Sequence, residues 1–215
     1  MKRSSKLFTV VLIVALMAAI LSSSIAVPLL WRGFYYLHID ALDLPEHTGY
    51  AVEEIRGAFD EMMDYCVFGE PFGTGVLKWS QSGYEHFADC AKLFRLDFTV
   101  ALISAVILLI LLILCKRGVH PVRLVGKGAM FWAGSVLSVG FIVIAGLAAM
   151  NFDRAFVIFH TLFFPGKTNW IFDYRTDEII NILPQVFFRN CALLIVGVLF
   201  AACIGLIIAD RIVDE

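Results

Sequence analysis

Four long apolar runs constrain the fold of this chain more than any other feature of its sequence. They are Leu7–Leu30, Phe98–Cys115, Met130–Met150 and Cys191–Ala209. An α-helix of about 20 apolar residues is long enough to cross the hydrocarbon core of a bilayer. Of the 215 residues 60% are hydrophobic, which is too large a share for a soluble domain. We therefore predict an all-α membrane protein with four transmembrane helices and a small, mostly helical extracytoplasmic cap.

Basic residues beside these runs indicate how the helices are oriented. They are Lys2, Arg3 and Lys6 before the first run, and Lys116, Arg117, Arg123 and Lys127 between the second and third. Lys and Arg in short loops favour the cytoplasmic side, so both termini and this loop should face the cytoplasm. The predicted order is transmembrane helix 1 (1–30), extracytoplasmic helical cap (31–97), transmembrane helix 2 (98–115), cytoplasmic loop (116–129), transmembrane helix 3 (130–150), extracytoplasmic interfacial segment (151–190), and transmembrane helix 4 with a cytoplasmic tail (191–215).

The first run is interpreted as a retained anchor, although Met1–Lys6 would also suit a signal peptide. The apolar residues continue past Ser22–Ser24 to Leu30, and no clear A-x-A cleavage site interrupts them. We expect a multi-pass protein of the cell membrane.

Charge and motifs exclude several classes of function. The net charge of −2 gives no indication of a nucleic-acid partner. The sequence has no Walker loop, no Gly-x-Ser-x-Gly frame and no HExxH metal motif. We predict no cofactor.

Two histidines on different outer segments are the candidate catalytic residues. His86 precedes the second apolar run on the same predicted helix, and His160 lies in the apolar stretch Phe152–Phe164. An imidazole exchanges protons near neutral pH, which suits acid or base catalysis. A structural histidine is the competing interpretation, since His38 and His47 are also predicted to lie outside.

Two carboxylates share a predicted helical face with these histidines. Asp89 follows His86 by three residues, and Asp153 precedes His160 by seven. Each could hold one tautomer of its imidazole. An ordinary surface charge is the alternative.

Cys66 and Cys90 are the two predicted outer cysteines. They could pair as a disulfide outside the cell. Alternatively, Cys90 could bind Zn²⁺ together with His86 and His160. The sequence leaves both interpretations open.

Two histidine-containing blocks resemble a known family. The first is Tyr84-Glu85-His86-Phe87-Ala88-Asp89-Cys90-Ala91-Lys92-Leu93-Phe94. The second is Phe159-His160-Thr161-Leu162-Phe163-Phe164, followed by Trp170-x-Phe172, Asp177-x-Ile179-Ile180 and Leu183-Pro184-x-x-Phe187-Phe188. With four spans and an acidic outer segment, the chain resembles the lipoprotein intramolecular transacylase family (Lit) of Gram-positive bacteria. Phe87 and Cys90 depart from the family pattern, which more often has Met and Val there.

The resemblance implies an acyltransferase with His86 and His160 as catalytic residues. Members move the sn-2 acyl chain of a diacylglyceryl-modified lipoprotein onto the α-amino group of its N-terminal cysteine. The partners would be such lipoproteins and membrane lipid; the oligomeric state is left open. Asp89 and Asp153 would orient the histidines, and Arg154, Trp170 and Asp177 would line the pocket.

Two other functions compete with this one. The first is a non-catalytic membrane protein whose outer cap binds a lipid or a protein. The second is a zinc-dependent membrane hydrolase built on His86, Cys90 and His160. A binding cap has no need for two converging imidazoles, whereas a zinc enzyme would lose activity with a chelator.

Overall fold

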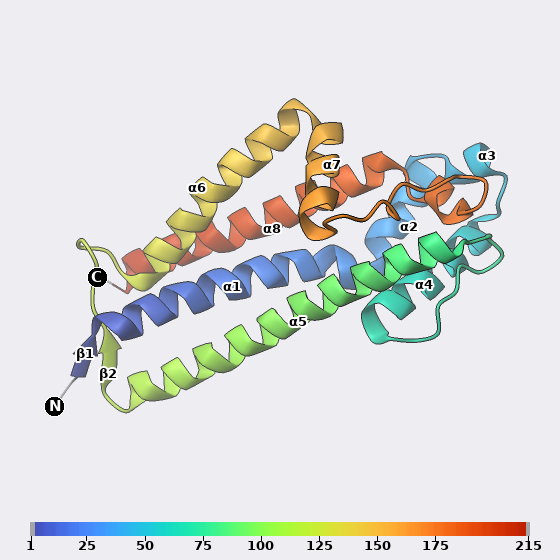
Figure 1. Ribbon diagram of the computed structural model, residues 1–215. Helices are drawn as coiled ribbons and strands as arrows, with labels where there is room; N and C mark the ends of the chain where they lie inside the picture. The colour runs from blue at the N-terminus through green and yellow to red at the C-terminus, as the bar shows by residue number, and fades with distance from the viewer. Residues whose placement is uncertain (1–2, 214–215) are drawn as a thin grey trace. The chain divides into compact units, whose positions relative to one another are not determined.

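The structure is a computed structural model that describes residues 3–213 (Figure 1). Among these residues, four helices are long and apolar enough to cross a membrane. They are α1 (Lys6–Leu30), α5 (Gln81–Lys116), α6 (Ala129–Met150) and α8 (Gln185–Ile212). Each contains one of the predicted apolar runs, so the predicted fold class is confirmed. Residues 1–2 and 214–215, predicted as part of helix 1 and of the cytoplasmic tail, lie outside the described residues.

Five shorter helices and two short strands complete the described chain. They are β1 (Arg3–Ser5), α2 (Arg32–Ala41), α3 (Leu44–Thr48), α4 (Val52–Phe68), β2 (Val119–Pro121), α7 (Phe152–Phe163) and the 3-10 helix η1 (Glu178–Ile182). Helix α4 buries one apolar stripe, which includes Ile55, Phe59, Met62 and Cys66. Gly69 ends this helix in the left-handed conformation, with a φ of 78°.

The chain divides into two compact units. The membrane unit comprises Met1–Ile25, Asp97–Met150 and Ile195–Glu215, taken over its described residues. The cap unit comprises Ala26–Leu96 and Asn151–Leu194. Helices α1, α5 and α8 each contribute residues to both units.

Three helices of the membrane unit pack around a small buried cluster. Leu137 of α6 lies with Leu199 and Cys203 of α8, and side chains of α1 pack against them. Gly134 allows α6 to approach α8 closely, because a Cβ there would lie 2.7 Å from the Cys203 carbonyl oxygen. Small residues have this role where helices meet in lipid.

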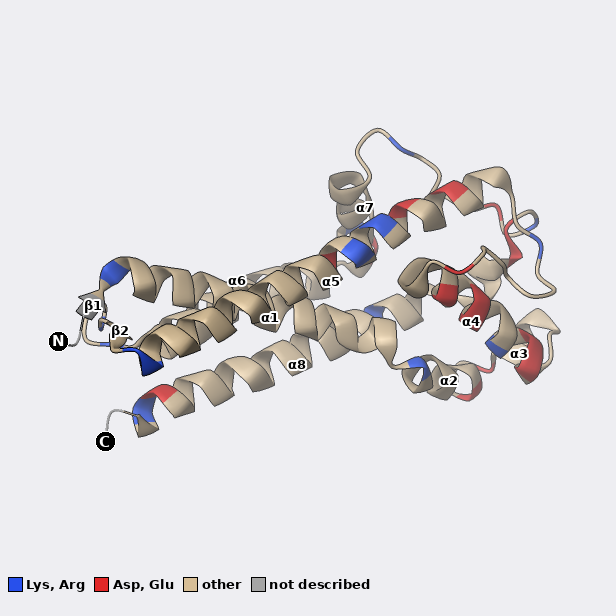
Figure 2. Ribbon diagram, turned by 90° about the horizontal axis from the view of Figure 1, so that it is seen from below, with Lys and Arg blue, Asp and Glu red and all other residues tan. Residues whose placement is uncertain are grey.

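The first and last described segments of the chain both contact the loop between α5 and α6. Strand β1 pairs in parallel with β2, so the residues before α1 lie beside the loop that precedes α6. The buried Thr9 hydroxyl donates to the Val122 carbonyl at 3.0 Å and accepts from its N–H at 2.8 Å. Asp210 of α8 accepts from the Gly128 N–H at 3.1 Å. Figure 2 shows Lys and Arg in blue near the N and C labels.

The cap unit has its own hydrophobic core. It is formed by α2, α4, η1 and the cap-unit parts of α5 and α8. The Tyr35 ring stacks on Phe59 with centroids 3.6 Å apart. Its hydroxyl donates to the Ile182 carbonyl at 2.8 Å, so α2 is tied to η1 inside the core.

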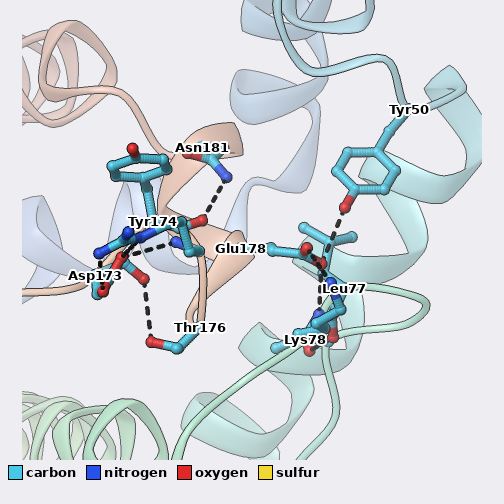
Figure 3. Close-up of polar contacts among 10 residues, drawn as sticks. Tyr50, Leu77, Lys78, Asp173, Tyr174, Thr176, Glu178 and Asn181 are labelled. Atoms are coloured by element: carbon cyan, nitrogen blue, oxygen red, sulfur yellow. Dashed lines mark hydrogen bonds and ion pairs between the residues drawn. The ribbon is translucent and has the colours of Figure 1, made fainter.

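A second contact holds η1 at the edge of this core. The Glu178 carboxylate accepts from the Tyr50 hydroxyl at 3.0 Å, from the Lys78 N–H at 2.8 Å and from Lys78 Nζ at 3.0 Å (Figure 3). The Glu178 N–H donates to the Lys78 carbonyl at 3.0 Å. These bonds bring the end of the 151–190 segment beside the residues that lead into α5.

The buried Tyr35 hydroxyl should contribute measurably to the stability of the cap unit. A Tyr35→Phe change leaves the Ile182 carbonyl buried without its partner, which costs about 1–2 kcal/mol. We expect the apparent Tm in detergent to fall by a few degrees, at about 2–4 °C per kcal/mol. Tyr174→Phe, in a ring that is 62% exposed, is the control. Equal melting of the two variants would show that the buried bond contributes nothing.

Candidate active site

His86 lies near the N-terminus of α5, on a helix start held by Ser80 and Asp177. The Ser80 hydroxyl accepts from the Gly83 N–H at 3.0 Å, as an N-cap does. Buried Asp177 accepts from the Ser80 N–H at 2.8 Å and from its hydroxyl at 2.9 Å. Gly83 leaves room for this contact, since a Cβ there would collide with the Asp177 carboxylate. Asp177 therefore positions the first turns of the helix that carries His86.

His160 lies in α7, which begins at a side-chain cap. The Asn151 Oδ1 accepts from the Arg154 N–H at 2.9 Å. His160 is buried on the inner face of α7, whereas Phe159, Leu162 and Phe163 are exposed on the other side. This division is typical of an amphipathic helix whose apolar face meets lipid.

The structure brings the two histidines together. Their ring centroids are 5.8 Å apart and the planes differ by 30°. Phe164 and Phe172 lie edge-on to His86 at 5.1 and 5.4 Å. Trp170 stacks on His160 at 4.6 Å. Both imidazoles are thus surrounded by aromatic rings, with 5% and 7% of their residue surface exposed.

The hydrogen bonds of the ring nitrogens distinguish this pair from two other cap-unit histidines. His160 Nδ1 lies 2.8 Å from the Phe156 carbonyl oxygen, and His86 Nε2 lies 3.5 Å from Cys90 Sγ. His86 Nδ1 is buried with no partner among the described residues. His38 instead has both nitrogens engaged, and His47 is exposed. Of these four histidines, only His86 and His160 lie close to each other, and His86 has a ring nitrogen without a partner among the described residues.

Burial keeps both imidazoles neutral at pH 7. It lowers the pKa of His86, which precedes the apolar run of α5, to about 4, and nearby His160 adds to the shift. Burial also lowers the pKa of His160, although the bond to the Phe156 carbonyl opposes this. A neutral imidazole can accept a proton at one nitrogen and donate a hydrogen bond from the other.

Asp89 acts on His86 through its charge, which partly offsets the lowering of the His86 pKa by burial, and its hydrogen bonds go to other partners among the described residues, so its orienting role stays a prediction. Its buried carboxylate forms ion pairs with Lys167 and with Lys92, the latter at 3.0 Å, and accepts from Asn169 Nδ2 at 3.2 Å. Burial raises its pKa, but these three donors outweigh that effect and bring the pKa to about 2. Asp89 therefore ties the loop after α7 to α5.

The other predicted site residues have different surroundings, and one of them, Trp170, contacts a histidine. Asp153 accepts from Gln185 Nε2 at 2.7 Å, and its orienting role toward His160 stays a prediction. Arg154 is exposed, and its backbone N–H takes part in the cap of α7. Trp170 contacts His160, and Asp177 acts through the start of α5.

Cys66 and Cys90 are free thiols, so the disulfide considered from the sequence is not formed. The Cys66 thiol faces the Phe87 carbonyl at 3.7 Å, while Cys90 lies against His86. Burial raises the pKa of both thiols, that of Cys66 to about 12. Within residues 3–213 no three His, Cys, Asp or Glu side chains are gathered to hold a metal ion, His86, Cys90 and His160 included.

Sequence reasoning missed Lys167, Asn169 and Ser80. Lys167 and Asn169 lie in an irregular loop, where helical periodicity gives no information about contacts. Their position just before Trp170 was the only local signal. Ser80 could have been recognised as a helix cap, because a serine is a preferred N-cap and a long run without Gly or Pro follows from Tyr84.

Two of three comparisons with known proteins identify similar proteins. A family model described as lipoprotein intramolecular transacylase Lit matches residues 10–188. The solved structure of the membrane-integral lipoprotein intramolecular transacylase Lit from Bacillus cereus is 25% identical, with a TM-score of 0.84 over 95% of this chain and 93% of that chain. Two variants of that protein, with one histidine replaced by arginine or alanine, are 24% identical, with a TM-score of 0.79 over 95% of this chain and 89% or 91% of theirs. A search of curated proteins finds no relative.

The lowered histidine pKa values predict a loss of stability in mild acid. An unfolded chain binds a proton at His86 near pH 6.5, whereas the folded one does so near pH 4. The free energy of unfolding should therefore fall as the pH drops through this window, by on the order of 1–3 kcal/mol. The Asp89 contribution persists here, since it is lost only as the pH falls below 3.8 towards about 2.

Thermal unfolding in detergent at several values between pH 7 and pH 4.5 measures this slope. His86→Phe should flatten it, while His47→Phe, at an exposed position, should keep it. A slope that is unchanged in His86→Phe would contradict the burial of a neutral imidazole.

Proposed function

The chain belongs to the lipoprotein intramolecular transacylase family and is an acyltransferase, and we propose that His86 and His160 catalyse its reaction. In this proposal the sn-2 acyl chain of a diacylglyceryl-modified lipoprotein moves to the α-amino group of the N-terminal cysteine, leaving a lyso-form lipoprotein. The observation that carries the proposal is the convergence of two buried imidazoles, one from α5 and one from α7.

His160 is the proposed general base. A carbonyl oxygen only accepts hydrogen bonds, so the contact with Phe156 assigns the proton of neutral His160 to Nδ1. The lone pair is then on Nε2, the other ring nitrogen. Nε2 is therefore the atom that takes a proton from the attacking amine.

His86 is the proposed donor to the oxyanion. The Cys90 thiol stays protonated because burial raises its pKa, and it can donate to Nε2 at 3.5 Å. The imidazole proton then lies on Nδ1, the buried nitrogen without a partner. A neutral imidazole can stabilise a tetrahedral oxyanion through such a hydrogen bond without giving up its proton.

The bonds and protons of the reaction balance with these two groups. The amine nitrogen forms a bond to the acyl carbon while its proton passes to His160 Nε2. Collapse of the tetrahedral intermediate breaks the bond to the glycerol sn-2 oxygen, and His160 returns the proton to that oxygen. The products are an amide and a free hydroxyl group, with no covalent enzyme intermediate.

Proximity favours this route, since ester and amine belong to one molecule. Well-oriented intramolecular reactions can gain about 7–11 kcal/mol from it. A site that holds the two ends together can therefore supply much of the catalysis.

We also propose cytoplasmic termini and a site at the outer face. Supporting this, Lys6, Arg123, Lys127 and Arg211 belong to segments that contacts gather at one end of the membrane unit. Basic residues favour the cytoplasmic side.

Replacing either catalytic histidine should abolish most of the conversion. We expect His86→Ala and His160→Ala to lower the rate of lyso-form lipoprotein synthesis by about 10²–10⁴-fold, as loss of an acid–base group or an oxyanion donor does. Mass spectrometry of lipoprotein N-termini, after expression in a bacterium without such an activity, measures it.

His47→Ala is the matched control, since this histidine is exposed and makes only a contact with the Asp43 carbonyl. Conversion at the control rate by either histidine variant would remove that residue from the mechanism. A wild-type chain that leaves the host lipoproteins unchanged would favour the non-catalytic alternative.

Reporter fusions should report the proposed orientation. A fluorescent protein that folds only in the cytoplasm should fluoresce when fused after Glu215. Alkaline phosphatase, active only outside, should be active when inserted after Gly75, in the loop between α4 and α5. The opposite pattern would invert the topology.

A further inference from the structure

Asn169 carries a buried acceptor that nothing in the protein satisfies. Its Oδ1 is enclosed and has no hydrogen-bond partner among the described residues. Leaving a buried acceptor unpaired costs about 1–3 kcal/mol. Such groups are uncommon in folded proteins, and each one therefore needs an explanation.

The orientation of this amide is determined by its neighbour. Asn169 Nδ2 lies 3.2 Å from Asp89 Oδ2, and a carboxylate can only accept. The NH₂ group must therefore face Asp89, and the oxygen must point away from it. Because Asp89 is itself held by Lys92 and Lys167, the amide has a fixed support.

Asn169 is linked to both proposed catalytic histidines through its neighbours. Trp170, the next residue, stacks on His160. Asp89, the partner of the amide, lies one turn after His86 on α5. The second buried atom of the cap unit without a partner is His86 Nδ1. The described part of the cap unit thus contains two buried side-chain atoms that lack a hydrogen-bond partner, one on His86 and one on Asn169.

We propose that Asn169 Oδ1 binds the α-amino group of the substrate's N-terminal cysteine, an inference that rests on the proposed acyl transfer. A neutral primary amine has two N–H groups and one lone pair. His160 Nε2 takes the proton of one N–H group, and the other N–H group donates to Asn169 Oδ1. With both N–H groups held, the lone pair is directed at the acyl carbon. Asn169 is therefore a substrate-binding residue, supported through Asp89.

The test compares two non-reactive lipopeptides. Both are diether analogues of a diacylglyceryl cysteinyl dipeptide, which have no ester to transfer, and one of them lacks the α-amino group. We expect the wild type to bind the amine-bearing analogue more tightly than the desamino analogue, because the amine bonds to both His160 and Asn169. Asn169→Leu should lower this preference about tenfold, the effect of one hydrogen bond, and the preference that remains comes from His160. Asn181→Leu, which loses only a contact with the Tyr174 carbonyl (Figure 3), should keep the wild-type preference.

Two outcomes would overturn the inference. They are equal binding of the two analogues by the wild type, and a preference that is unchanged in Asn169→Leu, whether or not that variant binds both analogues more weakly. Should Asn169→Leu fail to fold, judged by thermal unfolding, Asn169→Ala takes its place with the same expected loss of preference, about tenfold, since alanine also has no acceptor. Turnover of the ester substrate is scored separately. A wild type that prefers the amine but gives no acyl transfer contradicts the proposed function, whereas acyl transfer with an unchanged preference in Asn169→Leu contradicts only the role of Asn169.

Discussion

A buried carboxylate on α5 is the interaction on which the candidate site depends. Asp89 binds Lys167 and Asn169, which lie in the loop between α7 and η1. That loop carries Trp170, which stacks on His160. A buried charge is stable only when it is paired and hydrogen-bonded, so this carboxylate holds its partners strongly. The single anion therefore joins α5, which carries His86, to the loop that follows the helix of His160.

The same burial determines the chemistry that the histidines can perform. Among aromatic rings an imidazole is kept neutral, because the charged form would lose its hydration. A neutral pair can divide the tasks of acyl transfer, one ring as a base and the other as a hydrogen-bond donor. In water, by contrast, each imidazole would be part-protonated near pH 6.5 and bonded to solvent. The aromatic enclosure is thus part of the proposed mechanism as well as of the packing.

Two further contacts join the start of α5 to the 151–190 segment. Asp177 holds Ser80 at the start of α5, and Glu178 joins η1 to Lys78 and Tyr50. Asp177 and Glu178 bind Ser80 and Lys78, which precede α5. These bonds hold the start of that helix against the 151–190 segment. Gly83 has a steric reason to be a glycine, since any side chain there would displace Asp177.

The sequence by itself determined the four membrane-crossing helices, the helical outer segments and the two histidines, because apolar runs and helical periodicity are local properties. It also singled out Trp170 and Asp177. The partners of Asp89 and Asp153 were decided only by the tertiary structure: shared helical faces suggested the histidines, but ion pairs and hydrogen bonds from other segments bound these carboxylates instead. The cysteine spacing allowed a disulfide, yet the fold directs Cys66 to a backbone carbonyl and Cys90 to His86. Contacts between segments about eighty residues apart leave no periodic trace in the chain, which is why Lys167 and Asn169 emerged only once the loop was seen folded against α5.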